Sequence, residues 1–358
     1  MLYIPLERIK EGMLLARPVY GADFNILIAR GLELQEAQIK RIAEMGYPGV
    51  YIDSSDSSDI SIKDVVPDSL RINTAVAAKE LLNEVESGLR QKTNLKVNGD
   101  TQRRIVMPVI GALIDCRRRV IELVDLKPLP DYSYYHAANV VIISILLGLE
   151  MGITGSQLYE LGMASLIHDA GNTFIPKSIM QKPGRLSAEE YEVVKKHTEM
   201  GFQLLRERFD ISIDACIGAL QHHEHYDGSG YPNRLKKDKI SIYGRIIAVA
   251  DVYDALVSRR PFRPAMLPPE AMEFMRFNEG TMFDPEIVVA LRRIISLYPT
   301  GMEVELNTGV RCVVAHNYAG SPERPRLRLL NGISKVPSYI DLQIDRRFEN
   351  IRVSHIVI

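Results

Sequence analysis

Cysteine is scarce in this sequence, and net charge is almost absent. The three cysteines, Cys116, Cys216 and Cys312, lie far apart and form no C-x-x-C pair, which argues against a disulfide framework and a thiolate metal site. The formal net charge is -1, so the overall charge gives no indication of binding to a nucleic-acid polymer or a membrane surface. Basic clusters such as Arg117–Arg119 are most simply interpreted as solvated helix faces.

Long apolar runs are missing as well. The longest, Ala137–Leu149, is interrupted by Asn139 and Ser144 and is shorter than the roughly 20 residues that a bilayer requires. The N-terminal sequence MLYIPLERIKEG carries charges where a signal peptide needs apolar residues. We therefore expect a cytoplasmic protein. With 46% apolar and 25% charged residues, the composition is globular, and 358 residues allow two or three domains.

The pattern along the chain predicts a mainly α-helical protein with a small module at each end. Residues 1–65 alternate short apolar runs with Gly and Pro, contain one helical stretch near 35–45 and end in a Ser/Asp-rich stretch, so we expect a small α/β module there. Residues 66–105 form a predicted helical linker, residues 106–298 a succession of helices, and residues 299–358 a β-rich segment. The linker's apolar stripe comprises Ala78, Leu81, Leu82, Val85 and Leu89.

Several element boundaries follow from local signals. Pro108 suits a first helical turn and predicts a helix over Val109–Val124. Ser187 and Glu190 form a capping box, which predicts a helix running through His197 to about Leu205. In the last segment, alternating apolar residues flank Asn307-Thr308-Gly309 and indicate a β-hairpin, with further strands at 326–330 and 351–358.

Histidines are concentrated in the helical segment. Six of the eight lie between positions 136 and 225. A lone histidine on an apolar helix face is usually a hydrogen-bonded core residue, but so many buried imidazoles would each need a separate partner. Five helical elements bring such a group, or an aspartate, to the edge of an apolar stretch: His136, His168 with Asp169, His197, His222 with His223, and Asp251. Neutral imidazoles and carboxylates without thiolates suit Fe, Mn or Zn.

The adjacent pair His168-Asp169 has a specific use in such a centre. The aspartate has two oxygens and can bridge two metals while its neighbour completes one coordination shell. Two metals about 3.5–4 Å apart clamp the attacking and leaving oxygens of an in-line phosphoryl displacement, with a hydroxide held between them as the nucleophile. A His-Asp pair alone is a weak signal, and its weight here comes from the other histidines.

A second motif, HHEHYDGSGYP, occupies residues 222–232. Gly228 and Gly230 would let the backbone approach a ligand closely, and Pro232 would stiffen the exit from the loop. Tyr231 offers an aromatic face to a base or a hydroxyl to a phosphate. Without the paired histidines at its start, this segment would be interpreted as a surface turn.

The HD pair followed by HHExxDGxGYP resembles the HD-GYP family of cyclic di-GMP phosphodiesterases, a branch of the HD metal-dependent phosphohydrolases. The resemblance covers about residues 106–298 and implies a helical HD-type domain. It also implies two metal sites that share Asp169. One would consist of His136, His168, Asp169 and Asp251, and the other of Asp169, His197, His222 and His223.

The same resemblance implies substrate contacts. Tyr231 matches the family tyrosine near the guanine nucleotide. Arg260 and Arg263, in the sequence SRRPFR, match basic positions that contact substrate phosphates, a role that suits bidentate arginine. Without the motif these arginines would be interpreted as solvated loop charges.

Two positions depart from the family pattern. The family commonly reads HDIGK, whereas this chain has Asn172 in place of the lysine, which removes a positive charge where negative charge develops. We therefore expect reduced or altered catalysis with metal binding retained. Some members bind a third metal through a glutamate four residues before the first histidine. That position is Tyr132 here, so we expect two metals per chain.

Taken together, the motifs predict hydrolysis of cyclic di-GMP to the linear dinucleotide pGpG, with GMP as an open further product. The expected cofactors are two divalent ions, Fe or Mn first and Zn as a further candidate. Two alternatives stay open: a cyclic di-GMP receptor without turnover, for which Asn172 is the main support, and an HD phosphohydrolase acting on another nucleotide. A homodimer and signalling protein partners are also left open.

Overall fold

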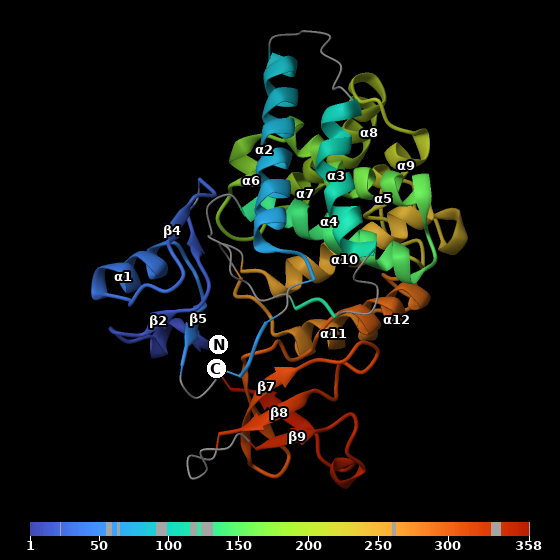
Figure 1. The fold of residues 1–358 in the computed structure, drawn as a ribbon. Helices are drawn as coiled ribbons and strands as arrows, with labels where there is room; N and C mark the ends of the chain where they lie inside the picture. The colour runs from blue at the N-terminus through green and yellow to red at the C-terminus, as the bar shows by residue number, and fades with distance from the viewer. Residues whose placement is uncertain are drawn as a thin grey trace.

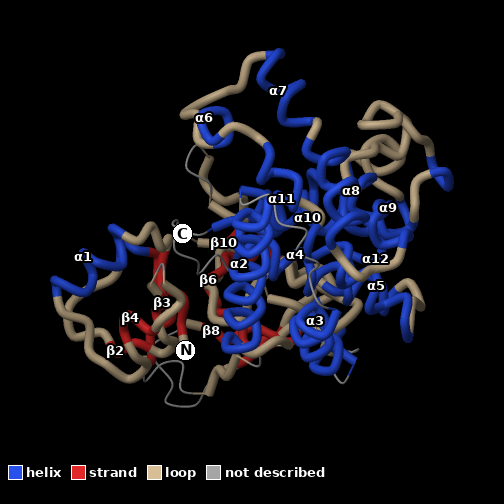
Figure 2. Tube along the Cα trace, turned by 90° about the horizontal axis from the view of Figure 1, so that it is seen from above, coloured by secondary structure: helices blue, strands red, loops and turns tan. Residues whose placement is uncertain are grey.

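A computed structural model describes residues 1–21, 23–54, 59–62, 65–90, 99–114, 120–122, 132–259, 263–330 and 338–357. These residues form a helical body with a small α/β part beside it and a β-rich part below it (Figure 1). Seen from above, the strands are confined to these two smaller parts and the large helices to the body (Figure 2). The mainly α fold class, with an N-terminal α/β module and a β-rich C-terminal segment, is confirmed.

The N-terminal part contains two small sheets and one helix. Strands β1 (Leu2–Pro5), β5 (Gly49–Asp53) and β2 (Leu14–Leu15) form an antiparallel sheet, while β3 (Val19–Tyr20) pairs with β4 (Ile26–Ile28). Helix α1 (Glu36–Glu44) matches the predicted helical stretch and buries Ile42 in a local apolar cluster. A short 3-10 helix, η1 (Leu6–Arg8), follows β1.

The helical body extends from α2 to α12 around one apolar core. Its α-helices are α2 (Asp68–Arg90), α3 (Gly99–Ile114), α4 (Tyr132–Glu150), α5 (Gly155–Ile167), α6 (Lys177–Met180), α7 (Ala188–Lys195), α8 (His197–Arg208), α9 (Ile213–Gln221), α10 (Ile242–Val257), α11 (Pro268–Phe277) and α12 (Pro285–Ile294), with 3-10 helices η3 (Ala170–Phe174) and η4 (Lys237–Lys239) between them. The predicted stripe of α2 enters this core through Ala78, Leu81 and Val85.

Helix α4 is the central helix of that core. An 18-residue window, Ser133–Glu150, is long and apolar enough to cross a bilayer, but 78% of it is buried inside the protein. The helix is longer than the apolar run Ala137–Leu149, so its length does not distinguish it from a helix that crosses a membrane. Its burial does, because the surrounding helices already cover its apolar surface.

Two predicted helix boundaries are wrong. Pro108 does not open a helix but lies inside α3, on an exposed face next to Met107, which is 50% exposed. The opposite face buries Val106, Val109 and Leu113, and this packing outweighs the hydrogen bond that proline cannot donate.

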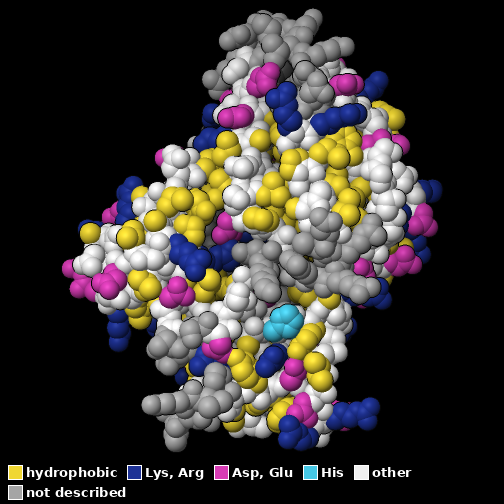
Figure 3. Space-filling model, viewed as in Figure 1, with side chains coloured by type: hydrophobic (Ala, Val, Ile, Leu, Met, Phe, Trp, Pro, Cys, Tyr) yellow, Lys and Arg dark blue, Asp and Glu magenta, His cyan; other side chains and the backbone are white. Residues whose placement is uncertain are grey.

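Apolar side chains gather on the exposed face of the body around α2 and α3 (Figure 3). The Arg117–Arg119 cluster lies outside the described residues.

The second wrong boundary concerns the helix predicted from Ser187 to about Leu205. The capping box itself is present, with Ser187 Oγ accepting from the Glu190 N–H and the Glu190 carboxylate accepting from the Ser187 N–H. The segment nevertheless forms two helices, α7 and α8, which meet at Lys196. His197 is therefore the first residue of a helix, directly after the last turn of another one.

The C-terminal part is a five-stranded antiparallel sheet with the order β10-β6-β7-β8-β9. The strands are β6 (Glu303–Leu306), β7 (Arg311–His316), β8 (Arg326–Leu329), β9 (Tyr339–Asp341) and β10 (Val353–Ile356), with η5 (Arg346–Phe348) before the last one. The predicted hairpin is confirmed, since β6 pairs with β7 across the Asn307–Gly309 turn. Strand β9 was not predicted from the sequence.

The N-terminal part contacts both other parts. The Tyr3 N–H donates to the Gly301 carbonyl at 2.9 Å, beside the C-terminal sheet. Phe24 packs against Tyr135 of α4 with ring centroids 5.0 Å apart, and Arg259, just after α10, donates to the Gly46 carbonyl at 3.2 Å. The α/β part is thus in contact with the body next to His136.

Candidate metal centre

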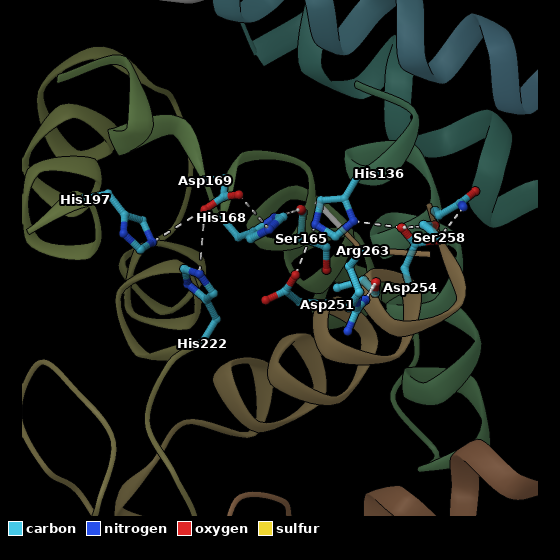
Figure 4. A network of polar contacts seen from close by, with 12 residues as sticks. His136, Ser165, His168, Asp169, His197, His222, Asp251, Asp254, Ser258 and Arg263 are labelled. Atoms are coloured by element: carbon cyan, nitrogen blue, oxygen red, sulfur yellow. Dashed lines mark hydrogen bonds and ion pairs between the residues drawn. The ribbon is translucent and has the colours of Figure 1, made fainter. Parts of the chain in front are cut away.

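The seven residues predicted as metal ligands meet inside the helical body. Figure 4 shows six of them, all except His223. His136 lies near the start of α4, and Asp251 lies within α10. The other five lie at helix ends, where side chains of separate helices can converge: His168 and Asp169 after α5, His197 at the start of α8, and His222 and His223 after α9. These ends meet because the apolar residues of the same helices pack into one core.

The donor atoms fall into two groups. One atom from each of Asp169, His197, His222 and His223 lies within 4.8 Å of the others, and we call this group the histidine-rich half. Donor atoms of His136, His168 and Asp251 meet the same limit, and we call this group the acidic half. A metal bound to nitrogen and oxygen ligands at about 2 Å needs donors at such mutual separations.

Asp169 faces both halves. Its Oδ2 lies 3.6 Å from His168 Nε2, whereas its Oδ1 lies 3.5 Å from His197 Nε2 and 3.9 Å from His222 Nε2. One carboxylate oxygen is therefore directed to each half, with His197 and His222 on one side and His168, His136 and Asp251 on the other (Figure 4). The side chain is 42% exposed, so this carboxylate is also open to solvent or a ligand.

Backbone carbonyls fix the tautomers of three histidines. Nδ1 of His168, His197 and His222 lies 2.8, 2.7 and 2.6 Å from the carbonyl oxygen three residues earlier in each case. A carbonyl only accepts, so each Nδ1 carries the proton and each Nε2 keeps its lone pair. All three Nε2 atoms are buried and have no hydrogen-bond partner among the described residues. Buried lone pairs of this kind fit a bound metal ion.

The charge states of the cluster also fit a divalent metal. Burial, followed by the neighbouring histidines, lowers the pKa of His222 well below its usual value, and burial lowers that of His223 to about 4. Burial would raise the pKa of Asp169, but His168, His197 and His222 outweigh it and hold the pKa low. Neutral imidazoles around an ionised carboxylate are the forms that coordinate metals.

His136 behaves differently. Burial would lower its pKa, but hydrogen bonds to Asp251 and Asp254 outweigh that effect and raise the pKa to about 9. Its Nε2 lies 3.0 Å from Asp251 Oδ1, and its Nδ1 lies 2.7 Å from Asp254 Oδ2. Asp251 is held ionised by the same contact, which lowers its pKa against the effect of burial.

Two glycines bring the HD pair close to α8. A Cβ on Gly171 would lie 1.9 Å from the carbonyl oxygen of His197, and the Gly171 N lies 3.2 Å from the Cβ position of Gly201. Only glycine allows this contact between η3 and α8. It places Asp169, two residues before Gly171, next to His197.

The loop after His223 is held by a buried glutamate. Glu224 is 2% exposed, and its carboxylate accepts the N–H groups of Asn233 at 2.6 Å and Leu235 at 3.0 Å. Gly230 packs against the backbone of His223–His225, where a Cβ would lie 2.2 Å from the His225 nitrogen. The expectation that Gly230 admits a ligand is therefore wrong, because this glycine closes the loop on itself. Glu224 directly follows the paired histidines, and its role in holding the loop was not predicted from the sequence.

Tyr231 lies at the rim of the histidine-rich half. Its ring stacks on His223 with centroids 4.8 Å apart, and Tyr191 of α7 approaches it edge-on at 6.4 Å. The Lys195 ammonium lies over both tyrosine rings, 5.4 Å from the Tyr191 centroid and 5.8 Å from that of Tyr231. Sequence reasoning missed Tyr191 and Lys195, which carry no local signal and reach the rim only through the packing of α7.

The remaining predicted site residues are less closely associated with the cluster. Arg263 donates to the carbonyl of Ala255, beside the acidic half (Figure 4). Asn172 lies in η3, where its N–H donates to the Asp169 carbonyl at 2.9 Å. Arg260 and the side chain of Tyr132 lie outside the described residues.

Comparisons with known proteins agree with this arrangement. A family model described as an HD domain matches residues 123–287, which contain all seven cluster residues. A cyclic di-GMP phosphodiesterase of Pseudomonas aeruginosa is 29% identical over 327 residues, which cover 84% of this chain and 78% of the relative. The chain therefore contains a match to an HD domain and is similar to cyclic di-GMP phosphodiesterases of the HD-GYP type.

Other HD-GYP relatives match a shorter stretch. The cyclic di-GMP phosphodiesterase response regulator of Xanthomonas campestris is 42% identical over 147 residues, 40% of this chain and 38% of that protein. A 3'3'-cGAMP-specific phosphodiesterase of Vibrio cholerae is 30% identical over 228 residues, 62% of this chain and 49% of that protein. The chain thus spans less than half the length of these two relatives. A solved HDG"Y"P protein of Bdellovibrio bacteriovorus has a TM-score of 0.48 at 16% identity, covering 81% of this chain and 97% of that one.

Proposed function

We propose that this protein is a phosphodiesterase that hydrolyses cyclic di-GMP to pGpG at the HD-GYP metal centre. The observation that carries the proposal is the position of Asp169, with one oxygen directed to each half. Around it lie three buried Nε2 atoms that have no hydrogen-bond partner in the described parts of the chain. Relatives named as cyclic di-GMP phosphodiesterases support the choice of substrate. Whether hydrolysis continues to GMP is a question for product analysis.

The proposed ligand sets share Asp169. His136, His168, Asp169 and Asp251 would hold one ion, and Asp169, His197, His222 and His223 the other. When bound, the two ions supply an ionised water and neutralise the charge that develops on the phosphate. The protein directs the lone pairs through the three carbonyl-bonded histidines and holds Asp169 ionised between the halves.

The donor set favours Fe or Mn, with Zn as a further candidate, because imidazole and carboxylate ligands accept all three. Two ions per chain are proposed because Tyr132 occupies the position of the glutamate used for a third. Metal analysis of anaerobically purified protein should give two per chain. Three per chain would contradict the assignment of Tyr132.

At the substrate end, we propose that Tyr231 stacks on a guanine base and that Arg260 and Arg263 contact the phosphates. The Tyr231 ring is supported by His223 on one face, which leaves the other side of the ring towards Tyr191 and Lys195. Asn172 is proposed to donate a neutral hydrogen bond where the family has a lysine, which would lower the rate without releasing the metals.

A second candidate substrate has specific support. Relatives of similar identity in Vibrio cholerae are named as 3'3'-cGAMP-specific phosphodiesterases, at 30% and 40% identity over the matched stretches. This cyclic dinucleotide contains one adenine in place of one guanine, and a stacking tyrosine accepts either base because both present an aromatic face.

The decisive experiment is a product assay on anaerobically Fe- or Mn-loaded protein with cyclic di-GMP and 3'3'-cGAMP in parallel. We expect linear pGpG from cyclic di-GMP, with Asp169→Asn protein as the inactive control. Binding of cyclic di-GMP without product would replace the enzyme with a receptor. Faster turnover of 3'3'-cGAMP would reassign the substrate.

The wider proposals concern organisation and location. We propose residues 106–298 as the catalytic domain, residues 1–65 as an α/β module and residues 299–358 as a β-rich segment. Residues 66–105 are proposed as the helical link between the first two, and their buried residues pack on the same core as the catalytic domain. A cytoplasmic location follows from the proposed substrate. Association with a second copy or with signalling proteins would act through the two end modules.

A further inference from the structure

Behind His136 lies a buried carboxylate that belongs to neither group of donor atoms. Asp254 follows Asp251 by three residues on α10 and is 0% exposed. Its Oδ2 lies 2.7 Å from His136 Nδ1, and its Oδ1 accepts the Asn139 side-chain amide at 2.5 Å. The Ser258 hydroxyl lies 3.5 Å from the same Oδ2 (Figure 4).

His136 Nδ1 pairs with Asp254 because of the position of His136 in α4. His168, His197 and His222 each follow the last turn of a helix, where carbonyls have no intrahelical partner and can accept from Nδ1. His136 lies in the first turns of α4, where the carbonyls are engaged by the next turn and the unsatisfied groups are N–H donors. An acceptor for His136 Nδ1 must therefore come from another element, and α10 supplies it.

The acceptor supplied is charged, unlike the three carbonyls. The acidic half contains the carboxylate of Asp251 and has that of Asp254 directly behind it, whereas Asp169 is the one carboxylate of the histidine-rich half. A carboxylate behind an imidazole fixes the ring and raises the basicity of the other nitrogen, and losing such a partner typically lowers metal affinity by roughly 10–100-fold. The two halves therefore differ in charge.

We propose that Asp254 is a positioning residue that aims His136 Nε2 into the acidic half and makes that half the tighter of the two metal sites. This inference rests on the proposed function, since it concerns the same metal centre. It concerns metal binding, however, and can be tested without any substrate. A merely structural buried pair between Asp254 and His136 would stabilise the fold without changing the order in which the halves fill.

Two substitutions separate the charge of Asp254 from its hydrogen bonds. Asp254→Asn keeps an oxygen that can accept from His136 Nδ1. Asn139 Oδ1 is buried and has no partner among the described residues, so rotating that amide would let it accept from the new Asn amide. This variant therefore removes the charge while the hydrogen bonds are kept. Asp254→Ala removes both.

A matched control is another buried carboxylate of the helical body. Asp284 is 4% exposed, caps α12, pairs with Arg245 at 2.6 Å and belongs to neither donor group. Asp284→Asn should lower the melting temperature while leaving metal binding at the wild-type level. It shows how loss of a buried carboxylate acts when only the fold is affected.

The experiment titrates full-length, metal-stripped protein anaerobically with Mn(II) and records both the bound stoichiometry and the electron paramagnetic resonance spectrum. Wild-type protein should bind two ions in two steps and give the spectrum of a coupled pair. Asp254→Asn should weaken the tighter step by about tenfold, and Asp254→Ala by about a hundredfold. At the Mn(II) concentration that just saturates both sites of the wild type, the alanine variant should still hold an isolated ion and little coupled pair.

Each result of the titration has one interpretation. The inference would be overturned if both Asp254→Asn and Asp254→Ala bound both ions with wild-type affinity. It would also be overturned if only the weaker of the two binding steps were affected. If the alanine variant does not fold, as judged by circular dichroism, the asparagine variant decides the question. Two ions bound by wild-type protein that hydrolyses neither cyclic dinucleotide would refute the proposed function and leave this inference standing.

Discussion

The metal cluster and the rim around Tyr231 are built in different ways. In the cluster, His168, His197 and His222 are buried and each is held by a carbonyl of the preceding helix turn. At the rim, Tyr191 is 48% exposed and Tyr231 comes from a loop, held by stacking and by the backbone around Glu224. Most of the candidate metal ligands thus lie at helix ends, whereas the candidate base-stacking ring of Tyr231 comes from a loop. Both departures from the family pattern, Asn172 and Tyr132, change residues near the cluster without replacing any of the seven ligand candidates.

The largest effect should come from Asp169, the residue whose two oxygens face the two halves. Asp169→Asn removes the negative charge and one strong metal-binding oxygen, so both ions should be weakened together. We expect turnover to fall by at least about a hundredfold, because each ion contributes several kcal/mol to the transition state. The measurement is product formation together with metal content. Circular dichroism should match wild type, since the side chain is 42% exposed. Two tightly bound ions in this variant would show that Asp169 does not bridge.

The next largest effect should come from the contact between η3 and α8, which holds Asp169 next to His197. In Gly171→Ala, the new Cβ meets the His197 carbonyl at 1.9 Å, so η3 and α8 must separate. We expect a loss of about 1–3 kcal/mol in the free energy of unfolding, measured by denaturant titration, and a lower metal content.

Gly111→Ala is the control for that variant. Gly111 lies in α3 with nothing within 4 Å of its Cβ position, and alanine there should leave stability unchanged or raise it by up to about 1 kcal/mol. Equal destabilisation by both substitutions would contradict the role given to the contact between η3 and α8.

At the rim, Tyr231→Ala should weaken substrate binding and leave the metals in place. Stacking of one base on an aromatic ring is worth about 1–3 kcal/mol, so KM should rise by roughly 5–150-fold. Tyr231→Phe keeps the ring and should stay near wild type. The measurement is steady-state kinetics with metal analysis. A loss of bound metal in Tyr231→Ala would instead make the stacked pair with His223 part of the cluster.

The smallest effect should come from Asn172→Lys. A charge-assisted hydrogen bond exceeds a neutral one by about 1.4 kcal/mol, so turnover should rise by up to about tenfold. Asn172→Gln adds length without charge and should give no gain. If lysine gives no gain either, the charge argument for Asn172 is lost.

The sequence predicted the donors of the cluster because each one lies where an apolar run meets a polar group. His168-Asp169 and His222-His223 are recognisable in this way without any contact information. Asp254 and Glu224 were not recognised, because a buried carboxylate has no local signature and its role depends on its partner. Pro108 was misplaced for a related reason: the local preference for a helix start was outweighed by the packing of α3 against the core.

The sequence by itself determined the chemistry of the centre: imidazoles and carboxylates without thiolates, carried by helices with apolar faces. Only the tertiary structure decided which Asp169 oxygen faces which half, which imidazole nitrogen keeps its lone pair, and why His136 takes its acceptor from α10. His136 and Asp254 are 118 residues apart in the chain, and their atoms come within 2.7 Å because α4 and α10 pack in one core. Periodicity and spacing describe single elements, whereas these relations arise between elements.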